Sequence, residues 1–282
     1  MSGKIGVGVI TCNREDFLTQ CLDSIPLGMV DEICVINDGD RLSVDITDNY
    51  RKIFMQEHVV NLGVGKSKND ALKYLTSMDC DYIFLLEDDI ILLDKNVFNE
   101  YIKAHKASGI HHFNYGPGSP FNRKQTIKNY DLHNRHLLDQ HTEPNPRMVI
   151  DYGNDIKVSL FEHTVAMFSF FTKEILDKVG LIDEDYYNAW EHVDHTYRII
   201  KEGYHPPFWY FADVYNSHKY VTEAPEAIDK SSIANDDEQW KKNVYGGREI
   251  YKEKHGHYPN QPPVTSKNEV LDVIKKIKKN NE

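Results

Sequence analysis

Short apolar runs alternate with amphipathic helical patterns through the first hundred residues, and this alternation constrains the fold more than any other feature. The runs at 4–10, 32–36 and 82–86 predict buried strands, and Val59–Val60 indicates a further one. Helical patterns at 14–25 and 66–75 separate these runs. Strands that alternate with helices predict an α/β fold, with a mostly parallel sheet flanked by helices.

The second half begins with a loop-rich insert and then returns to regular patterns. Residues 107–160 are rich in Gly, Pro, Asn and His and predict long loops with few regular elements. A last amphipathic pattern at 270–279 predicts a C-terminal helix docked on the domain, with a membrane-surface anchor as the alternative. The remaining predicted elements are strands at 163–171 and 208–214 and helices at 173–179 and 191–201.

Composition excludes several classes of protein. The 282 residues are 40% hydrophobic and 27% charged, which excludes a disordered, collagenous or coiled-coil chain. A net charge of −11 argues against a general polyanion binder, although residues 101–150 hold seven Lys/Arg against three Asp/Glu. The four cysteines form no CxxC pair, and no apolar stretch approaches the roughly 20 residues of a membrane helix. Without a leader pattern, we expect a soluble cytoplasmic protein with reduced thiols.

The strongest chemical signal is an acid motif, Glu87-Asp88-Asp89, which directly follows a buried strand. Neighbouring carboxylates raise one another's pKa unless a cation compensates, and hard oxygen ligands suit Mg²⁺ or Mn²⁺. An acidic turn solvated at a strand end is the alternative interpretation. Ligands of parallel sheets gather at the carboxyl ends of the strands. Other polar residues at these ends are Thr11, Asn13, Arg14 and Asp38.

Two glycine-containing segments resemble nucleotide-binding motifs only superficially. Residues 63–67 (GVGKS) resemble a phosphate-binding loop, but that motif needs a glycine five residues before Gly65, where Val60 stands. Gly6-Val7-Gly8 lies inside the first strand and lacks a third glycine. Neither a P-loop ATPase nor a nicotinamide-dependent dehydrogenase is supported.

Taken together, the N-terminal segments resemble the nucleotide-sugar-binding half of GT-A-type glycosyltransferases, close to the large inverting family two. The matching order is VGVITCNRED, CLDSI, EICVINDGD, NLGVGKSKNDAL and DYIFLLEDDI. The resemblance implies a GT-A fold with a Rossmann-like sheet. Its halves would be a donor-binding half at 1–106 and an acceptor-binding half at 107–256 that contains the insert 107–160. A C-terminal tail helix would occupy 257–282.

The resemblance also implies roles for individual residues in donor and metal binding. Asp38 matches an aspartate that contacts the base or ribose of the donor. Asp89 matches the metal-coordinating carboxylate, Glu87 stands where the family has aspartate, and His218 matches a late histidine that completes the metal site. The implied cofactor is Mn²⁺ or Mg²⁺. The donor-binding residues would be Thr11, Asn13, Arg14, Asp38, Gly63, Lys66, Asn69 and Asp88.

The segment 190–204 resembles the acceptor-side helix of the family, and it leaves the catalytic base open. His192 stands where the family has its catalytic aspartate, and the ordinary histidine pKa of about 6.5 suits a base near neutral pH. Glu191 is the rival, and Asp194 would orient the acceptor. Consecutive helix residues point about 100° apart, so we do not expect Glu191 and His192 to face the same hydroxyl. A retaining reaction would need no such base.

These features predict a metal-dependent transferase that moves a sugar from a UDP-linked or other nucleoside diphosphate sugar to a hydroxyl, with inversion. The alternatives are a nucleotidyltransferase, whose glycine-rich N-terminal loop is absent, and a catalytically inactive sugar-nucleotide or glycan-binding module. The acceptor is a glycan, a lipid-linked sugar or a hydroxymethylated base in viral DNA. The last would place the enzyme in host cytoplasm, and the cations and aromatics of the insert suit a phosphate polymer. A merely solvated loop is the other interpretation of the insert.

Overall fold

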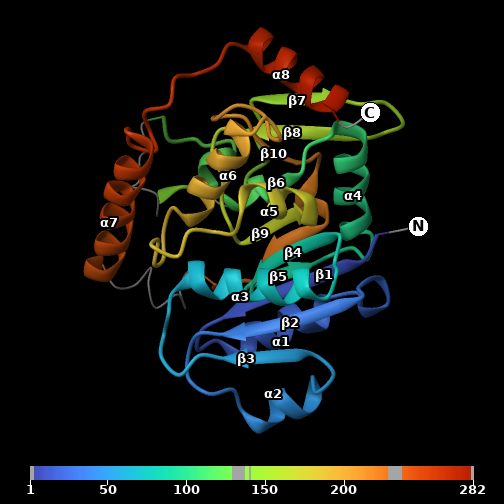
Figure 1. Cartoon of the computed structure of the whole chain (residues 1–282), viewed down its shortest axis with the longest axis vertical. Helices are drawn as coiled ribbons and strands as arrows, with labels where there is room; N and C mark the ends of the chain where they lie inside the picture. The colour runs from blue at the N-terminus through green and yellow to red at the C-terminus, as the bar shows by residue number, and fades with distance from the viewer. Residues whose placement is uncertain (1–2, 129–136, 140, 228–236, 281–282) are drawn as a thin grey trace.

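A six-stranded, mostly parallel sheet forms the centre of the molecule in the computed structural model, which describes residues 3–128, 137–139, 141–227 and 237–280 (Figure 1). Its strand order is β3-β2-β1-β4-β9-β6. The first four of these strands pair in parallel, whereas β9 is antiparallel to both of its neighbours. This architecture confirms the predicted fold class. The strands are β1 (Ile5–Thr11), β2 (Glu32–Asn37), β3 (Phe54–Glu57), β4 (Tyr82–Glu87), β6 (His112–Asn114) and β9 (Phe168–Thr172).

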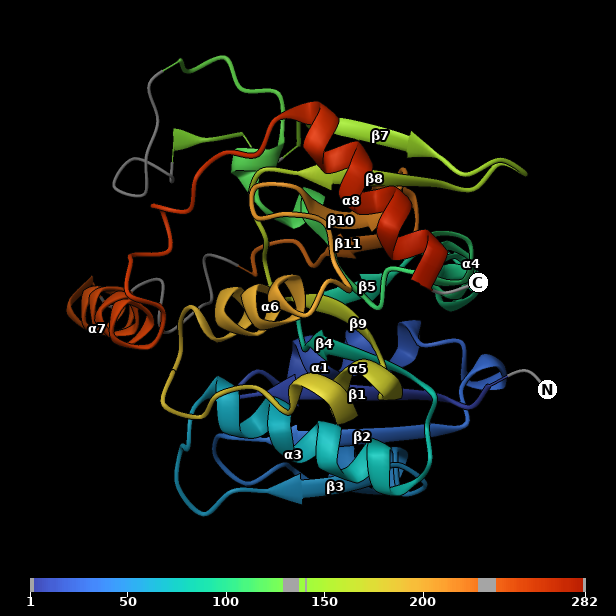
Figure 2. The same cartoon turned by 45° about the horizontal axis from the view of Figure 1, so that its top comes forward.

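Helices cover both faces of this sheet (Figure 2). One face packs against α1 (Glu15–Ser24) and α4 (Val97–Ser108), and α2 (Val44–Asn49) adds Ile46 to the same core. The other face packs against α3 (Val64–Ser77), α5 (Lys173–Val179) and α6 (Glu191–Lys201). Because the strands are buried on both sides, β1 and β4 are apolar runs rather than alternating patterns.

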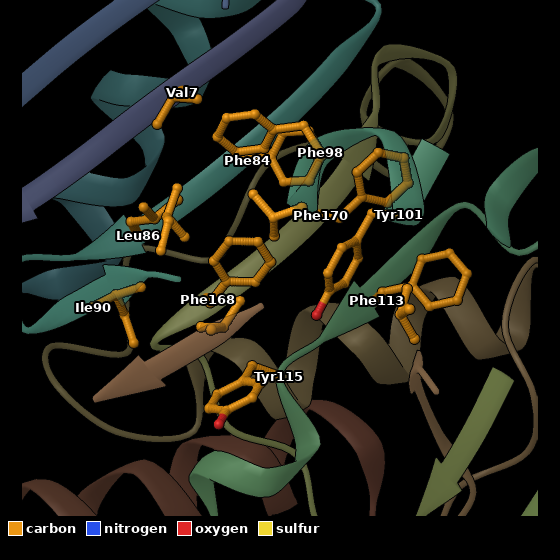
Figure 3. Close-up of a cluster of buried hydrophobic side chains, with 14 of the residues drawn as sticks. Val7, Phe84, Leu86, Ile90, Phe98, Tyr101, Phe113, Tyr115, Phe168 and Phe170 are labelled. Atoms are coloured by element: carbon orange, nitrogen blue, oxygen red, sulfur yellow. The ribbon is translucent and has the colours of Figure 1, made fainter. Parts of the chain in front are cut away.

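Aromatic side chains dominate the core on the α4 face (Figure 3). Phe84 of β4 lies with its ring centroid 4.6 Å from Phe98 and 5.1 Å from Phe170, and Tyr101 lies 5.1 Å from Phe168. These rings are fully buried, and each such side chain stabilises the fold by roughly 1.5–3 kcal/mol through burial alone. The core therefore holds β4, and with it the acid motif at its end, in a fixed position.

The glycines of β1 allow α3 to pack closely on the sheet. A Cβ atom at Gly8 would lie 2.8 Å from the Cβ of Ala71, and one at Gly6 would lie 2.9 Å from the Cδ2 of Leu75, both in α3. Carbon atoms pack no closer than about 3.5 Å, so a larger residue would push the helix away. The Gly6-Val7-Gly8 segment thus has a packing role, consistent with its rejection as a dinucleotide motif.

Two smaller sheets extend the core toward the second half of the chain. β7 (Met148–Asp151), β8 (Lys157–Phe161) and β10 (Phe211–Val214) form an antiparallel sheet in the order β10-β8-β7. β5 (Ile90–Leu92) pairs with β11 (Val221–Glu223). The insert therefore contains β6, β7 and most of β8, which is more regular structure than its loop-like composition predicted. Residues 129–136 and 140 of the insert lie outside the described residues.

The segment after β3 differs from the sequence-based prediction, whereas the C-terminal helix agrees with it. The strand at Val59–Val60 is wrong, because β3 ends at Glu57 and both valines are exposed. The docked C-terminal helix is confirmed: α8 (Lys267–Asn280) buries Val270, Ile274 and Ile277 in the α4-side core. The preceding helix, α7 (Asp237–His255), lies beside α6 (Figure 1). Among the described residues, the helices are too short or too polar to span a bilayer.

Candidate active site

The carboxyl ends of β1 and β4 form the ligand edge of the sheet. The strand order reverses between these neighbours, and such a switch point is where α/β sheets bind ligands. Ile10 pairs with Glu87, and the Asp88 N–H donates to the Ile10 carbonyl at 3.0 Å. On the other side, the Ala224 N–H donates to the Asp89 carbonyl at 2.7 Å. Backbone hydrogen bonds thus hold the acid motif from both sides.

Arg14 is the counterion of the acid motif. Its Nε donates to Asp88 Oδ2 at 3.3 Å, its Nη2 donates to Asp88 Oδ1, and its Nη1 donates to Asp89 Oδ2 at 3.0 Å. The Thr11 hydroxyl donates to Asp88 Oδ2 at 2.7 Å. Of the predicted donor-binding residues, the structure therefore brings Thr11, Arg14 and Asp88 together at one point.

Burial raises the pKa of three carboxyl groups at this edge of the sheet. Burial raises the pKa of Asp88 to about 7, although the Arg14 charge and the Thr11 hydrogen bond oppose the shift. Burial and the Glu87 charge raise the pKa of Asp89. Glu223 of β11 is a further acid here, and burial together with the charges of Asp89 and Glu87 raises its pKa to about 7. Sequence reasoning missed Glu223, because only the β5–β11 pairing brings it beside the motif.

The residues predicted to bind metal fit that role in their chemistry but are not gathered into a preformed site. Asp89 Oδ1 and His218 Nδ1 are buried atoms that have no hydrogen-bond partner among the described residues. His218 lies in a 3₁₀ turn, where burial and the Arg123 charge lower its pKa. In the part of the chain that the structure describes, no three His, Cys, Asp or Glu side chains are grouped to hold a metal. Asp89 Oδ1 remains a hard, unpaired oxygen of the kind that Mg²⁺ and Mn²⁺ bind.

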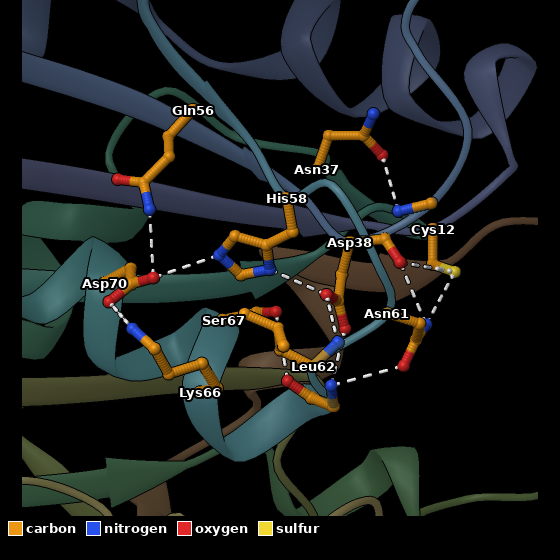
Figure 4. A network of polar contacts seen from close by, with 12 residues as sticks. Cys12, Asn37, Asp38, Gln56, His58, Asn61, Leu62, Lys66, Ser67 and Asp70 are labelled. Carbon is orange, nitrogen blue, oxygen red and sulfur yellow. Dashed lines mark hydrogen bonds and ion pairs between the residues drawn. The ribbon is translucent and has the colours of Figure 1, made fainter.

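Asp38 belongs to a buried polar network that shapes the neighbouring loop (Figure 4). Its carboxylate accepts from the Leu62 N–H at 2.7 Å and from the Gly63 N–H at 2.8 Å. His58 bridges two acids, with Nδ1 2.6 Å from Asp38 and Nε2 2.9 Å from Asp70. The structure thus shows that Asp38 fixes the 61–63 loop. Sequence reasoning missed His58, since a single histidine beside valines carries no signal.

Gly63 is required at the turn that leads into α3. Its φ is +90°, and a Cβ atom there would lie 2.4 Å from the Tyr187 carbonyl oxygen. Lys66, one turn into the helix, forms an ion pair with Asp70. Asn69 is buried, and its amide donates to the Ile182 carbonyl at 2.7 Å. Lys66 therefore extends the Asp38 network, whereas Asn69 ties α3 to the segment that precedes α6.

A cleft of about 400 Å³ opens beside Arg14. Its volume lies within the usual range of roughly 300–1,000 Å³ for small-molecule sites. Asn13, with a left-handed φ of 58°, accepts the Asp40 N–H and shapes one wall. The lining residues are Asn13, Arg14, Glu15, Asp16, Phe17, Asp40, Arg41 and Leu42.

The start of α6 is joined to the acid motif through one buried lysine. Lys68 Nζ donates to Glu191 Oε1 at 3.0 Å and to Glu87 Oε1 at 3.1 Å. His192 Nδ1 lies 3.3 Å from the same Glu191 Oε1. Burial raises the pKa of Glu191, but the charges of Lys68 and His192 outweigh burial and hold it below its usual range. Lys68 was not among the residues predicted from the sequence.

Asp194 lies in a different cluster, between α6 and α7. Its Oδ1 is 2.7 Å from His255 Nε2, and its Oδ2 accepts from Arg198 Nε at 2.9 Å. Tyr186 donates to Oδ1 at 3.3 Å. Because both oxygens are bonded and the residue is buried, the structure uses Asp194 to join α6 to α7.

The mostly parallel central sheet flanked by helices, with an acid motif where its strand order reverses, resembles the GT-A glycosyltransferase fold. The family model described as glycosyl transferase family 2 matches residues 7–180, which is more than half of the chain. The chain therefore belongs to glycosyl transferase family 2, and it is a glycosyltransferase.

The individual relatives share 12–25% sequence identity with this chain. The chain is 25% identical over 248 residues to "Uncharacterized glycosyltransferase R363" of Acanthamoeba polyphaga mimivirus, covering 82% of this chain and 85% of that protein. Among solved structures, S. aureus TarS matches 80% of this chain with a TM-score of 0.51 and 15% identity, which shows the shared fold. This chain spans 37% of TarS. A mannosyltransferase from Pyrobaculum calidifontis, solved with GDP-Man and Mn²⁺, is 12% identical with a TM-score of 0.43, covering 66% of this chain and 49% of that one.

Proposed function

We propose that this glycosyltransferase takes its sugar from a nucleoside diphosphate sugar, UDP-linked, and transfers it to an acceptor hydroxyl with inversion and with the help of a divalent metal. One observation carries the proposal. Arg14, Asp88 and Asp89 meet at the switch point, and Lys68 connects this motif to the helix start that bears His192. Charged groups for the donor and a base for the acceptor therefore occupy one edge of the sheet.

The donor binds along the edge from the cleft to the acid motif. Thr11, Asn13 and Arg14 lie along this path, and Arg14 holds the carboxylates of Asp88 and Asp89 in place beside the donor. Asp38 acts through the loop that it holds, so that Gly63 and Lys66 keep their places beside the donor. Asp89 would hold Mn²⁺ or Mg²⁺ through its unpaired Oδ1, with His218 and Glu87 as the further ligands. A bound metal supplies charge stabilisation for the leaving diphosphate.

His192 is the base in this proposal, and Glu191 orients it. The low pKa of Glu191 makes its carboxylate a poor proton acceptor, and its side chain is almost completely buried. His192 is partly exposed, and its Nδ1 faces Glu191, which leaves Nε2 to face the acceptor. Nε2 accepts the proton of the attacking hydroxyl as that oxygen bonds to the anomeric carbon and the bond from this carbon to the nucleoside diphosphate breaks. Asp194 supports this helix from its other side.

A glycan is the acceptor that the described insert favours. Three of its cations are bonded within the protein: Arg123 donates to the carbonyls of Pro117 and Thr142, Lys124 pairs with Glu143, and Arg147 pairs with Glu162. Cations that are already paired are poorly placed to neutralise phosphates. A hydroxymethylated base in DNA is therefore the second acceptor to test.

A mass-spectrometric screen of donors against acceptors tests this function. UDP-GlcNAc and GDP-mannose enter the donor panel, and glycans and hydroxymethylated DNA form the acceptor panel, with Mn²⁺ and across a salt series. We expect transfer from one donor to a glycan. Transfer to DNA that weakens with salt would assign the DNA acceptor instead. Nucleotide binding without any transfer would identify a binding module that kept the fold.

A further inference from the structure

Lys68 is a buried cation at the centre of the site. It lies on α3 with 2% of its surface exposed, and its Nζ is bonded to Glu191 and Glu87, which come from two distant parts of the chain. An ammonium group is expensive to bury unless it is paired and hydrogen-bonded. The carboxylates of Glu191 and Glu87 provide this pairing and hold the Lys68 ammonium between the start of α6 and the acid motif.

The other lysines of the same helix have different environments. The Lys66 side chain is 28% exposed and pairs with Asp70, and the Lys73 side chain is 52% exposed and lies 3.4 Å from Glu184. Lys68 differs from both because its side chain is 3% exposed and faces the sheet edge that carries the reaction. Its contacts are thus with the machinery of the site and not with solvent.

The position of Lys68 determines what Glu191 can do for His192. Lys68 Nζ and His192 Nδ1 approach the same oxygen, Glu191 Oε1, at 3.0 Å and 3.3 Å. A carboxylate held by an ammonium stays ionised and accepts the Nδ1–H of the imidazole. The partner of one ring nitrogen sets the tautomer, so the proton resides on Nδ1 and Nε2 carries the free electron pair.

We propose that Lys68 is a positioning residue that holds the Glu191 carboxylate against His192 and thereby keeps His192 in the tautomer whose Nε2 can accept the acceptor's proton. This inference rests on the proposed function, in which His192 is the base. In this role Lys68 affects the base and does not contact the donor.

Loss of the ammonium would leave Glu191 as a buried carboxylate without its cation. Glu191 would then take up a proton, or it would stabilise His192 as an imidazolium. In the first case the imidazole loses its anchor, and in the second case it loses its free electron pair. Either change makes His192 a weaker base at neutral pH.

Other charged and titratable groups near His192 do not replace Lys68. A small cavity, lined among others by Lys68, His112, His192 and His195, lies behind the imidazole. Burial lowers the pKa of His195 to about 4 and holds that of His112 well below its usual value, so both rings stay neutral near pH 7. Glu191 and Lys68 are then the charged side chains of the described residues that face His192 from α6 and α3.

Four variants test the proposal: Lys68→Met, Glu191→Gln, the double variant, and Lys73→Met as a control on the same helix. The first readout is the ¹⁵N chemical shifts of the imidazoles, with His192 assigned by the signal that His192→Gln lacks. The second readout is the pH dependence of kcat, together with KM for the donor found in the screen. The third readout is thermal unfolding of each variant.

The expected result is specific to a role through Glu191. Wild type and Lys73→Met show the Nδ1–H tautomer of His192, and Lys68→Met loses it. In Lys68→Met the acidic limb of kcat moves up by about one pH unit, because removal of a cation stabilises the imidazolium, while KM for the donor stays within about twofold. In the Glu191→Gln background, Lys68→Met adds no further shift, and the double variant unfolds at a higher temperature than Lys68→Met.

Other results would overturn the proposal. A rise in donor KM with unchanged ¹⁵N shifts would make Lys68 a donor-binding residue. Equal pH shifts in both Glu191 backgrounds would show that Lys68 acts without Glu191. A double variant as unstable as Lys68→Met would assign Lys68 to packing alone. If no donor supports transfer but the ¹⁵N shifts behave as expected, the proposed function fails while the positioning of His192 stands.

Discussion

Nδ1 of His192 lies 3.3 Å from Oε1 of Glu191, so the two candidate bases are hydrogen-bonded partners instead of independent alternatives. The 100° between consecutive helix residues predicted that they would not share one hydroxyl. The structure adds that the Glu191 side chain bends toward the ring of its neighbour. In the proposed reaction, Glu191 therefore orients the imidazole ring, and His192 accepts the proton.

The first prediction separates the roles of His192 and Glu191. His192→Ala should lower kcat by roughly 10²–10⁴-fold, the usual contribution of a general base. Glu191→Gln should cost less, since the amide oxygen still accepts the Nδ1–H. Steady-state kinetics and the anomeric configuration of the product check both points. Near-normal turnover of His192→Ala with a large loss in Glu191→Gln would make Glu191 the base, and a product that retains the donor's configuration would remove the need for a base.

The second prediction concerns Arg14. Arg14→Gln leaves Asp88 and Asp89 buried without their cation, so the free energy of unfolding should fall by about 2 kcal/mol, somewhat less than for a fully buried pair. Affinity for UDP should also fall. Arg51→Gln is the control, because Arg51 is exposed and does not line the cleft. Urea unfolding and calorimetric titration with UDP provide the measurements, and equal stabilities of the two variants would contradict the role of Arg14 as counterion.

The third prediction is a pH dependence of stability that arises from His205. Its Nδ1–H donates to the Pro206 carbonyl at 2.8 Å, and its Nε2 accepts the Ala212 N–H at 3.1 Å, so only the neutral ring fits. Burial lowers the pKa of His205 to about 4, below the roughly 6.5 of an unfolded chain. The folded state then binds fewer protons than the unfolded state between these pH values. His205 therefore lowers stability as pH falls from about 6.5 toward 4, by at most about 1.4 kcal/mol per pH unit.

Comparison of wild type with His205→Gln at each pH isolates this effect. The variant should be less stable at pH 7.5, and its deficit should shrink toward pH 4.5. His141→Gln, at an exposed position, should show a constant difference from wild type. A deficit of His205→Gln that does not change with pH would show that the ring does not titrate as predicted.

The sequence predicted the sheet well where burial is continuous and poorly at its edges. β1 and β4 are long apolar runs, which local patterns identify directly. β3 reads FMQE and is half exposed, so its pattern resembles a loop, and the valines that follow it drew the prediction to the wrong place. In β7 and β8, pairing with β10 decides the structure, and composition alone does not reveal that pairing.

Residues of the candidate site were likewise predicted only where the sequence signal is local. Consecutive residues such as Asp88 and Asp89 were predicted because their chemistry is visible in one motif. Lys68 looks like any solvated helix lysine until two carboxylates, 19 and 123 residues away along the chain, are placed beside it. Long-range pairs of this kind depend on the packing of α3 and α6 and have no local signal.

A calorimetric titration of UDP into wild type and Asp89→Ala, with Mn²⁺ and with EDTA, tests whether Asp89 holds the metal that binds the donor. If Asp89 binds the metal that holds the nucleoside diphosphate, wild type binds UDP tightly only when Mn²⁺ is present. Asp89→Ala then loses this metal-dependent binding while its unfolding temperature is maintained. Equal, Mn²⁺-dependent binding by both proteins would contradict this role of Asp89.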